Sequence, residues 1–98
     1  MSEFENELEK ARILAAELAQ DRPKLDLHGV FLTEGTLNEV DQFLYKCFNG
    51  GKSSVEIVYG IGEGKMQKFA LDFLKKHPLV ENIVEKQGYC IVILSEKI

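Results

Sequence analysis

One apolar stretch near the end of the chain, Tyr89-Cys90-Ile91-Val92-Ile93-Leu94, decides how a sheet can be built from this sequence. Side chains alternate between the two faces of a strand, so a stretch that is apolar at every position needs cover on both faces. Such a strand belongs in the interior of a sheet. We therefore predict that residues 89–94 form the central strand, which the chain enters through a turn at Gln87-Gly88.

Three further strands are expected before this one. Residues 24–28 and 53–59 alternate in the period of two that is typical of strands. Residues 79–86 are mixed in polarity, which indicates a strand at the edge of the sheet. The inward face of the second strand is predicted to comprise Val55, Ile57 and Tyr59.

Two helices separate these strands. The first is predicted to begin at Thr33 or Thr36, because Thr36-Leu37-Asn38-Glu39 has the form of a capping box, and to end at Asn49-Gly50-Gly51. The second covers about residues 64–77 and ends before Pro78, which cannot continue a helix. Its inward-facing side chains are predicted to be Met66, Phe69, Ala70, Phe73 and Leu74.

A further amphipathic helix is predicted over residues 3–21, with Ser2 as its N-cap and Pro23 after its end. Its apolar stripe is too narrow to form a core by itself. We expect this helix to dock on the domain, on a second copy of the chain or on a partner. The predicted stripe comprises Phe4, Leu8, Ala11, Leu14, Ala15 and Leu18.

The order of these elements predicts a two-layer α/β sandwich, β-α-β-α-β-β, preceded by the extra helix. Right-handed crossovers place both inner helices on one face of a four-stranded mixed sheet. With the apolar last strand in the middle, the strand order is 1-2-4-3. Residues 1–22 are expected to form the N-terminal helix and residues 23–98 the domain, and the other face of the sheet is bare unless that helix or a partner covers it.

The charge of the chain limits the kinds of nucleic-acid binding that are open to it. The 98 residues, 45% of them hydrophobic, are enough for one core, and the formal net charge is −4. Residues 1–22 carry six acidic against three basic side chains, whereas residues 23–98 carry ten against nine. A nearly neutral domain argues against avid, sequence-indifferent binding of nucleic acid. Any nucleic-acid site must therefore be a local patch.

The two cysteines and the absence of apolar runs indicate a cytoplasmic protein. Cys47 and Cys90 lie on predicted apolar faces, and no further ligands follow at the spacing of a zinc site. Both are expected to be reduced core residues. The sequence shows neither a signal peptide nor a stretch of the length needed to span a membrane, so cytoplasmic localisation is expected.

The first strand carries two polar residues that point to chemistry. In Leu25-Asp26-Leu27-His28-Gly29, alternation places Asp26 and His28 together on the face opposite the two leucines. Gly29 then lets the chain turn beside the imidazole and leaves room for a ligand. The alternative interpretation is a surface strand that carries two polar residues.

A glycine-rich turn, Gly60-Ile61-Gly62-Glu63-Gly64, follows the second strand. Because the first two strands are parallel neighbours, this turn should meet His28 at the carboxyl edge of the sheet. The backbone of the turn and the start of the next helix favour an anion, in particular a phosphate, and Lys65 and Lys68 add charge there. The spacing matches neither G-x-G-x-x-G nor a P-loop, and the alternative interpretation is a loop that needs glycine for its shape.

The two motifs, together with the helix between them, resemble the Smr domain, the small MutS-related module found at the C-terminus of MutS2-type proteins and as a stand-alone protein. The resemblance covers residues 24–95. It implies a fold similar to the C-terminal domain of bacterial translation initiation factor three. The family includes nucleases that cut or nick DNA, others that cleave RNA, and members that only bind nucleic acid.

The resemblance also implies roles for particular residues. Asp26 and His28 correspond to the functional residues of the first motif, and Gly60, Gly62 and Gly64 to the glycines of the second. One hypothesis is hydrolysis of phosphodiesters, in which the imidazole is a general acid or base and the carboxylate orients it or helps to hold a divalent cation such as Mg²⁺. A second is docking of nucleic acid or a ribosomal element without chemistry. A third is protein association through the N-terminal helix.

The second motif departs from the family pattern, which commonly has histidine or threonine, glycine, a basic residue, glycine, a small residue, glycine, and then leucine and arginine. Two positive charges are missing here and one negative charge is added. Each charge near a phosphate at a surface site is worth about 1 kcal/mol, so these changes weaken anion binding, and two nearby lysines compensate in part. The departing residues are Tyr59, Ile61, Glu63, Met66 and Gln67.

Overall fold

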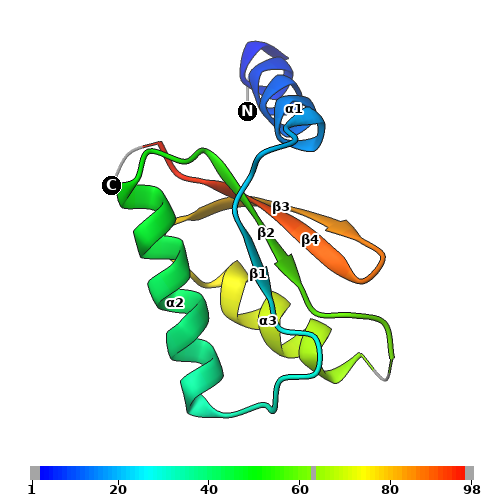
Figure 1. The fold of residues 1–98 in the computed structure, drawn as a ribbon. Helices are drawn as coiled ribbons and strands as arrows, with labels where there is room; N and C mark the ends of the chain where they lie inside the picture. The colour runs from blue at the N-terminus through cyan, green and yellow to red at the C-terminus, as the bar shows by residue number, and fades with distance from the viewer. Residues whose placement is uncertain (1–2, 63, 97–98) are drawn as a thin grey trace.

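Four strands form one mixed sheet in the order β1-β2-β4-β3, as Figure 1 shows for the computed structural model, which describes residues 3–62 and 64–96. β1 is parallel to β2, and β4 runs antiparallel between β2 and β3. The predicted strand order and the central position of residues 89–94 are confirmed. The strands are β1 (Lys24–Asp26), β2 (Ser54–Val58), β3 (Val80–Lys86) and β4 (Tyr89–Leu94).

The central strand is buried on both faces, as its composition predicts. Each residue from Cys90 to Leu94 is at most 3% exposed. Alternate residues of this stretch join the main core under the two inner helices, while Ile91 and Ile93 face the opposite side of the sheet. Cys47 belongs to the main core too, and both cysteines are free and buried, as predicted. Burial raises the pKa of the Cys90 thiol to about 12.

The first inner helix, α2 (Glu34–Asn49), begins one turn earlier than the predicted capping box requires. Thr33 is the N-cap: its side chain accepts from the Thr36 N–H, and the Thr36 hydroxyl accepts from the Thr33 N–H. The prediction of a capping box over residues 36–39 was therefore wrong. The Thr36 side chain is the N3 residue of a capping box over residues 33–36, where it accepts from the Thr33 N–H. The helix ends where predicted, with Gly50 as its C-cap.

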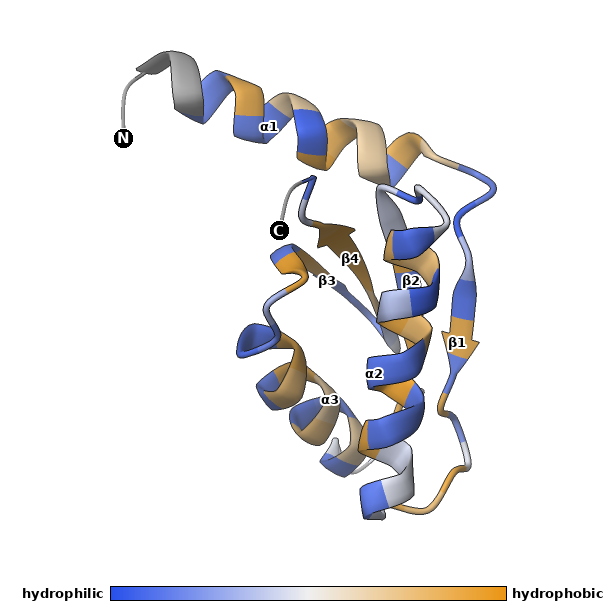
Figure 2. Cartoon of the chain, turned by 90° about the vertical axis from the view of Figure 1, so that its left-hand side faces the viewer, coloured by the Kyte–Doolittle hydropathy of each residue, from blue (hydrophilic) through white to orange (hydrophobic). Residues whose placement is uncertain are grey.

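The second inner helix, α3 (Lys65–Lys75), is shorter at both ends than predicted. Ala70 and Leu74 are buried as expected, and Leu71 is the third buried residue in place of the half-buried Phe69. Met66 and Phe73 pack against the core from its edge. Both inner helices lie on one face of the sheet, as the rule of right-handed crossovers predicts (Figures 1 and 2).

His77 follows α3, and its position just before Pro78 predicts a solvated residue at the C-terminal end of the helix. This prediction is wrong. Its side chain is only 3% exposed. Its Nδ1 accepts from the Leu79 N–H (3.1 Å), and its Nε2 lies 2.7 Å from Asp41 Oδ1. Because the first contact requires Nδ1 to be an acceptor, Nε2 carries the proton that the carboxylate accepts. The ring also packs beside Tyr45 and Phe73, so it joins the end of α3 to α2.

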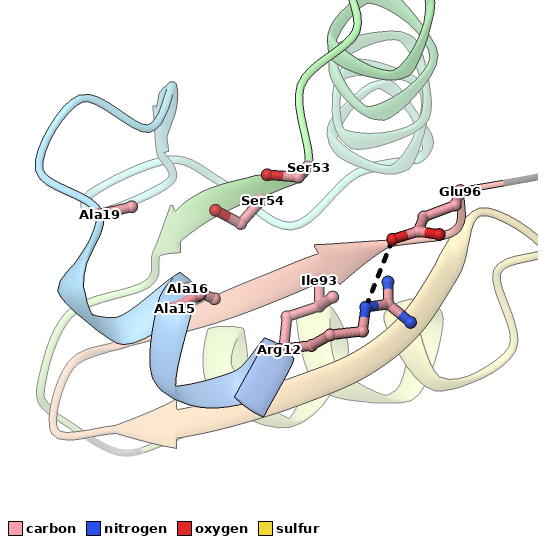
Figure 3. Close-up of a pocket in the computed structure, with 8 residues that line it drawn as sticks. All are labelled: Arg12, Ala15, Ala16, Ala19, Ser53, Ser54, Ile93 and Glu96. Carbon is pink, nitrogen blue, oxygen red and sulfur yellow. Dashed lines mark ion pairs between the residues drawn. The ribbon is translucent and has the colours of Figure 1, made fainter. Parts of the chain in front are cut away.

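The N-terminal helix, α1 (Glu3–Leu18), covers part of the face of the sheet that the inner helices leave open. Ala16 is buried against Ile91 and Ile93, and Ile13 packs beside them. Figure 3 shows Arg12 reaching Glu96 (3.6 Å) beside a cavity of about 230 Å³ between the helix and the sheet. The cavity is lined by Arg12, Ala15, Ala16, Ala19, Ser53, Ser54, Ile93 and Glu96.

The apolar stripe of α1 that was predicted to dock does not face the sheet. Leu8, Leu14 and Leu18 are all at least 50% exposed. The helix instead presents its Ile13 and Ala16 side to the sheet. Two ion pairs at the surface also join α1 to the edge strand β3: Arg12 with Glu81 and Glu17 with Lys86. Ser2 and the side chain of Phe4 lie outside what the structure describes, and docking of α1 on a partner or a second copy stays a prediction.

No helix within residues 3–62 and 64–96 has the length and apolar character needed to cross a membrane.

Candidate functional site

The two predicted motifs meet at the carboxyl edge of the sheet. Pairing of β1 with β2 continues one residue past β1, where the Leu27 N–H donates to the Val58 carbonyl (2.7 Å). His28 and Gly60 each lie two residues after the end of their strand. A Cβ placed on Gly60 would lie 2.7 Å from His28 Cδ2, so the imidazole packs on the bare backbone of the glycine. The predicted proximity of His28 and the glycine-rich turn is confirmed.

Asp26 acts on the backbone of this junction. Its Oδ1 accepts from the His28 N–H (2.8 Å), a local turn that fixes the chain at the point where the strand ends. Gly29 then turns the chain with a positive φ of 78°. Leu27 is buried on the inward face, whereas Asp26 and His28 are both exposed, as alternation predicts. The carboxylate therefore positions residue 28 through its main chain.

The glycine-rich turn is held from its other side by the β3–β4 hairpin. The Gly88 carbonyl accepts from both the Tyr59 N–H (3.0 Å) and the Gly60 N–H (2.8 Å). The Ile61 side chain lies over the same hairpin, since a Cβ on Gly88 would come within 3.3 Å of its Cγ1. The turn is thus anchored to a part of the chain that is distant in sequence.

A hollow of about 250 Å³ lies over the turn and the first turn of α3. The N-cap of α3 is Gly64, which supplies no side chain to cap the helix. The end of a helix without a side-chain cap favours an anion, because its N–H groups and dipole point toward the ligand. The hollow is lined by Tyr59, Gly60, Ile61, Gly62, Gly64, Lys65, Met66 and Gln67.

Lys65 and Lys68 both lie near this hollow, and only one of them lines it. Lys65 is exposed at its rim. Lys68 lies one turn further along α3 and pairs with Asp72 (3.7 Å). Because both members of this pair are exposed, it is weak and leaves the ammonium group accessible to an anion.

Residues 25–90 match the sequence profile of a known family, the Smr domain. The chain belongs to the Smr domain family. It is 38% identical over 61 residues to the endonuclease MutS2 of Halalkalibacterium halodurans, covering 62% of this chain and 8% of that protein. It is 34% identical over 73 residues to the endonuclease MutS2 of Clostridium perfringens, covering 74% of this chain and 9% of that protein. The chain thus spans less than a tenth of the length of these relatives.

The fold agrees with this membership. The Smr domain of Thermus thermophilus MutS2 superposes with a TM-score of 0.69 at 25% sequence identity. The match covers 74% of this chain and 98% of that chain. The match thus extends over almost all of that Smr domain, and α1 lies outside the residues of the family match.

Tyr59 stands at the first position of the second motif in this Smr domain, and its side chain is part of the hydrophobic core. It is buried, and its hydroxyl donates to the Tyr89 carbonyl (2.9 Å). Burial raises the pKa of this phenol to about 12, so it stays neutral at physiological pH. Tyr59 therefore holds the turn against β4. Because the family's histidine or threonine is replaced by tyrosine here, the imidazole at this junction comes from His28. Glu63, the acidic departure, lies outside the described residues.

Among the residues that the structure describes, metal ligands are sparse around the site. Within the described parts of the chain, no three histidine, cysteine or acidic side chains come together as a metal-binding group. Asp26 would supply a single carboxylate to a cation, and Mg²⁺ commonly completes its shell with substrate phosphate oxygens and water. The predicted divalent cation stays a prediction.

Sequence reasoning missed two residues at this end of the Smr domain. Gly88 was predicted to form a turn, but its role in holding the glycine-rich turn depends on a contact across the sheet that no local signal reveals. Phe31 lies three residues after His28 in a segment predicted as a loop, and its ring is 86% exposed. The apolar run Val30-Phe31-Leu32, between the predicted strand and the predicted helix, was the signal that could have found it.

Proposed function

We propose that this Smr domain binds the backbone of a nucleic acid at the junction of His28 with the glycine-rich turn and cleaves a phosphodiester there. The contact between the exposed imidazole and the Gly60 backbone carries the proposal. It puts a proton-transfer group beside a backbone that favours an anion. Kinship with proteins described as endonuclease MutS2 supports the same assignment.

The glycine-rich turn is suited to close approach of a phosphate. Gly62 does not have a positive φ, and a Cβ added to it would meet no atom within 4 Å, so the fold itself does not require glycine there. The absence of a side chain instead keeps the backbone open to a ligand. A phosphate in the hollow would face the first turn of α3, where fixed N–H groups stabilise charge that develops on its oxygens.

The chemistry assigned to His28 is proton transfer during hydrolysis. A water oxygen forms a bond to phosphorus, the bond from phosphorus to the leaving oxygen breaks, and that oxygen must gain a proton. Imidazole can take the proton of the attacking water or supply one to the leaving oxygen at neutral pH. Asp26 contributes by fixing the turn that carries the imidazole.

The proposal is tested with labelled single-stranded, duplex and branched DNA and RNA, with and without magnesium, following both binding and cleavage. We expect His28→Ala to lower the cleavage rate by about 100-fold or more while the fold and the affinity persist. Asp26→Asn is the matched variant, because its amide oxygen can still accept from the residue 28 N–H, and it should retain most of the activity. Cleavage by His28→Ala at the wild-type rate would contradict the proposal.

Binding without cleavage is the second candidate function, and the altered second motif favours it. Ile61 is 75% exposed at the position where the family commonly has a basic residue. This alternative predicts salt-sensitive binding with no turnover on any substrate. Lys65→Glu with Lys68→Glu should weaken that binding, whereas Lys10→Glu, a single charge reversal on α1, should not. Affinity that does not change with salt concentration would eliminate both candidates.

A further inference from the structure

Phe31 is the most exposed large apolar side chain in the described part of the chain, at 86%. Its neighbours Val30 and Leu32 are exposed as well. Together they make the loop between β1 and α2 apolar, which Figure 2 shows as an orange stretch at the bottom of the molecule. A run of apolar side chains on a surface marks a place where something binds.

The backbone around this ring is held in place. The Val30 N–H donates to the Leu27 carbonyl (3.1 Å), and the Thr36 hydroxyl donates to the Phe31 carbonyl (2.7 Å). Thr33 immediately follows the apolar stretch as the N-cap of α2. Since both sides of residue 31 are fixed, the fold presents the ring to solvent from a structured loop.

The position of the ring relates it to the proposed phosphate site. Phe31 lies three positions after His28 in the chain, so their Cα atoms lie within about 11 Å of each other. Ile61, also highly exposed, lies on the glycine-rich turn next to Gly60, on which the His28 ring packs. Apolar side chains thus belong to both segments that form the junction. A base attached next to a bound phosphate would lie within reach of them.

We propose that Phe31 is a stacking platform for an unpaired base, so that the ligand of this Smr domain is single-stranded or locally unpaired nucleic acid. The inference rests on the proposed function, because it assumes a phosphate at the glycine-rich turn. Residues 23–98 carry ten acidic against nine basic side chains, so charge alone gives little affinity. Stacking on an aromatic ring adds affinity that depends little on sequence, and only an unpaired base offers its face.

The chain contains no tryptophan, so Phe31→Trp places a single indole at the proposed platform. We expect its fluorescence to be quenched by a single-stranded 12-nucleotide oligothymidylate or oligouridylate, and not by a DNA duplex of the same length. The two single strands distinguish DNA from RNA. Leu18→Trp is the matched control, because residue 18 is similarly exposed but lies on α1 at the other end of the molecule.

Affinity provides the second readout. Phe31→Ala should weaken binding of the single strands by roughly 5- to 100-fold and leave duplex binding unchanged, and Phe31→Tyr should restore it. Wild-type affinity in Phe31→Ala, or an indole that no single strand quenches, would overturn the inference while the proposed function stands. Failure of the wild-type protein to bind any nucleic acid would overturn both.

Discussion

At the scale of single residues, the contact between Gly60 and His28 matters most. Gly60 has a φ of 82°, and its missing side chain leaves the space that the imidazole occupies. Two independent constraints therefore require glycine at this position. Neither constraint applies to Gly62. Gly60 therefore determines the shape of the turn, whereas Gly62 leaves its backbone accessible to a ligand.

This difference predicts opposite effects of the same substitution. Gly60→Ala should lower the free energy of unfolding by about 1–3 kcal/mol, because alanine is strained at positive φ and its methyl overlaps the His28 ring. Gly62→Ala should change it by less than about 0.5 kcal/mol but weaken oligonucleotide binding. Urea denaturation and binding titrations check both. Equal destabilisation by the two substitutions would contradict the assignment.

The buried thiol of Cys90 predicts how stability responds to alkali. Its pKa is about 12 in the folded chain against an ordinary value of 9, so the unfolded chain loses this proton first as the pH rises. The stability that the protonated thiol contributes is complete below pH 9 and is lost between pH 9 and about 12. Urea midpoints measured across this window should fall with pH, and the fall should be smaller in Cys90→Ala. An identical fall in the variant would show that other groups dominate.

At the scale of secondary-structure elements, His77 connects α2, the end of α3 and the start of β3. It accepts from the Leu79 N–H and donates to Asp41, and it packs between two aromatic rings. A buried imidazole with both nitrogens paired is a structural residue. The histidine of the candidate site is exposed, so the two histidines of this chain have different tasks.

Removal of His77 should therefore destabilise the fold more than removal of its exposed partner. His77→Ala leaves the Leu79 N–H without its acceptor and opens a cavity, so we expect a loss of about 2–4 kcal/mol. Asp41→Ala should cost about 1 kcal/mol or less, because the carboxylate is 45% exposed. Thermal or urea unfolding measures both variants. A larger loss in Asp41→Ala would mean that the hydrogen bond from His77 to Asp41 is the main contribution.

At the scale of the whole molecule, α1 lies on the face of the sheet that the inner helices leave open, whereas the candidate site lies at the carboxyl edge of β1 and β2 (Figures 1 and 2). Arg22 secures the end of α1: its guanidinium donates to the carbonyls of Ala16 and Ala19 and pairs with Glu56 on β2 (3.1 Å). The attachment of the helix is thus concentrated at a few polar contacts and the small apolar cluster around Ala16.

Arg22→Ala should release α1 without affecting the site. We expect faster amide hydrogen exchange in residues 3–18 and unchanged exchange in α2, because local opening follows the loss of the contacts that hold an element. Oligonucleotide affinity should stay within about twofold of wild type, since α1 supplies none of the residues that line the hollow over the glycine-rich turn. A marked loss of affinity would show that α1 takes part in binding.

The hydrophobic pattern of the sequence, combined with the right-handed crossover rule, was sufficient to predict the elements, the strand order and the edge at which His28 meets the glycine-rich turn. These features follow from patterns within each segment, because alternation in a strand and the three- to four-residue repeat of a helix are local. The resemblance to the Smr domain then indicated functional roles for Asp26 and His28.

Only the tertiary structure decided which side of α1 docks, that His77 is buried, that Gly88 holds the glycine-rich turn and that Phe31 stays exposed. Each of these depends on contacts between segments far apart in the chain. On α1 the side chains that pack on the sheet are Ile13 and Ala16, and the leucines of the predicted stripe stay exposed. Burial of a given side chain is determined by what packs against it, and that is a property of the assembled fold.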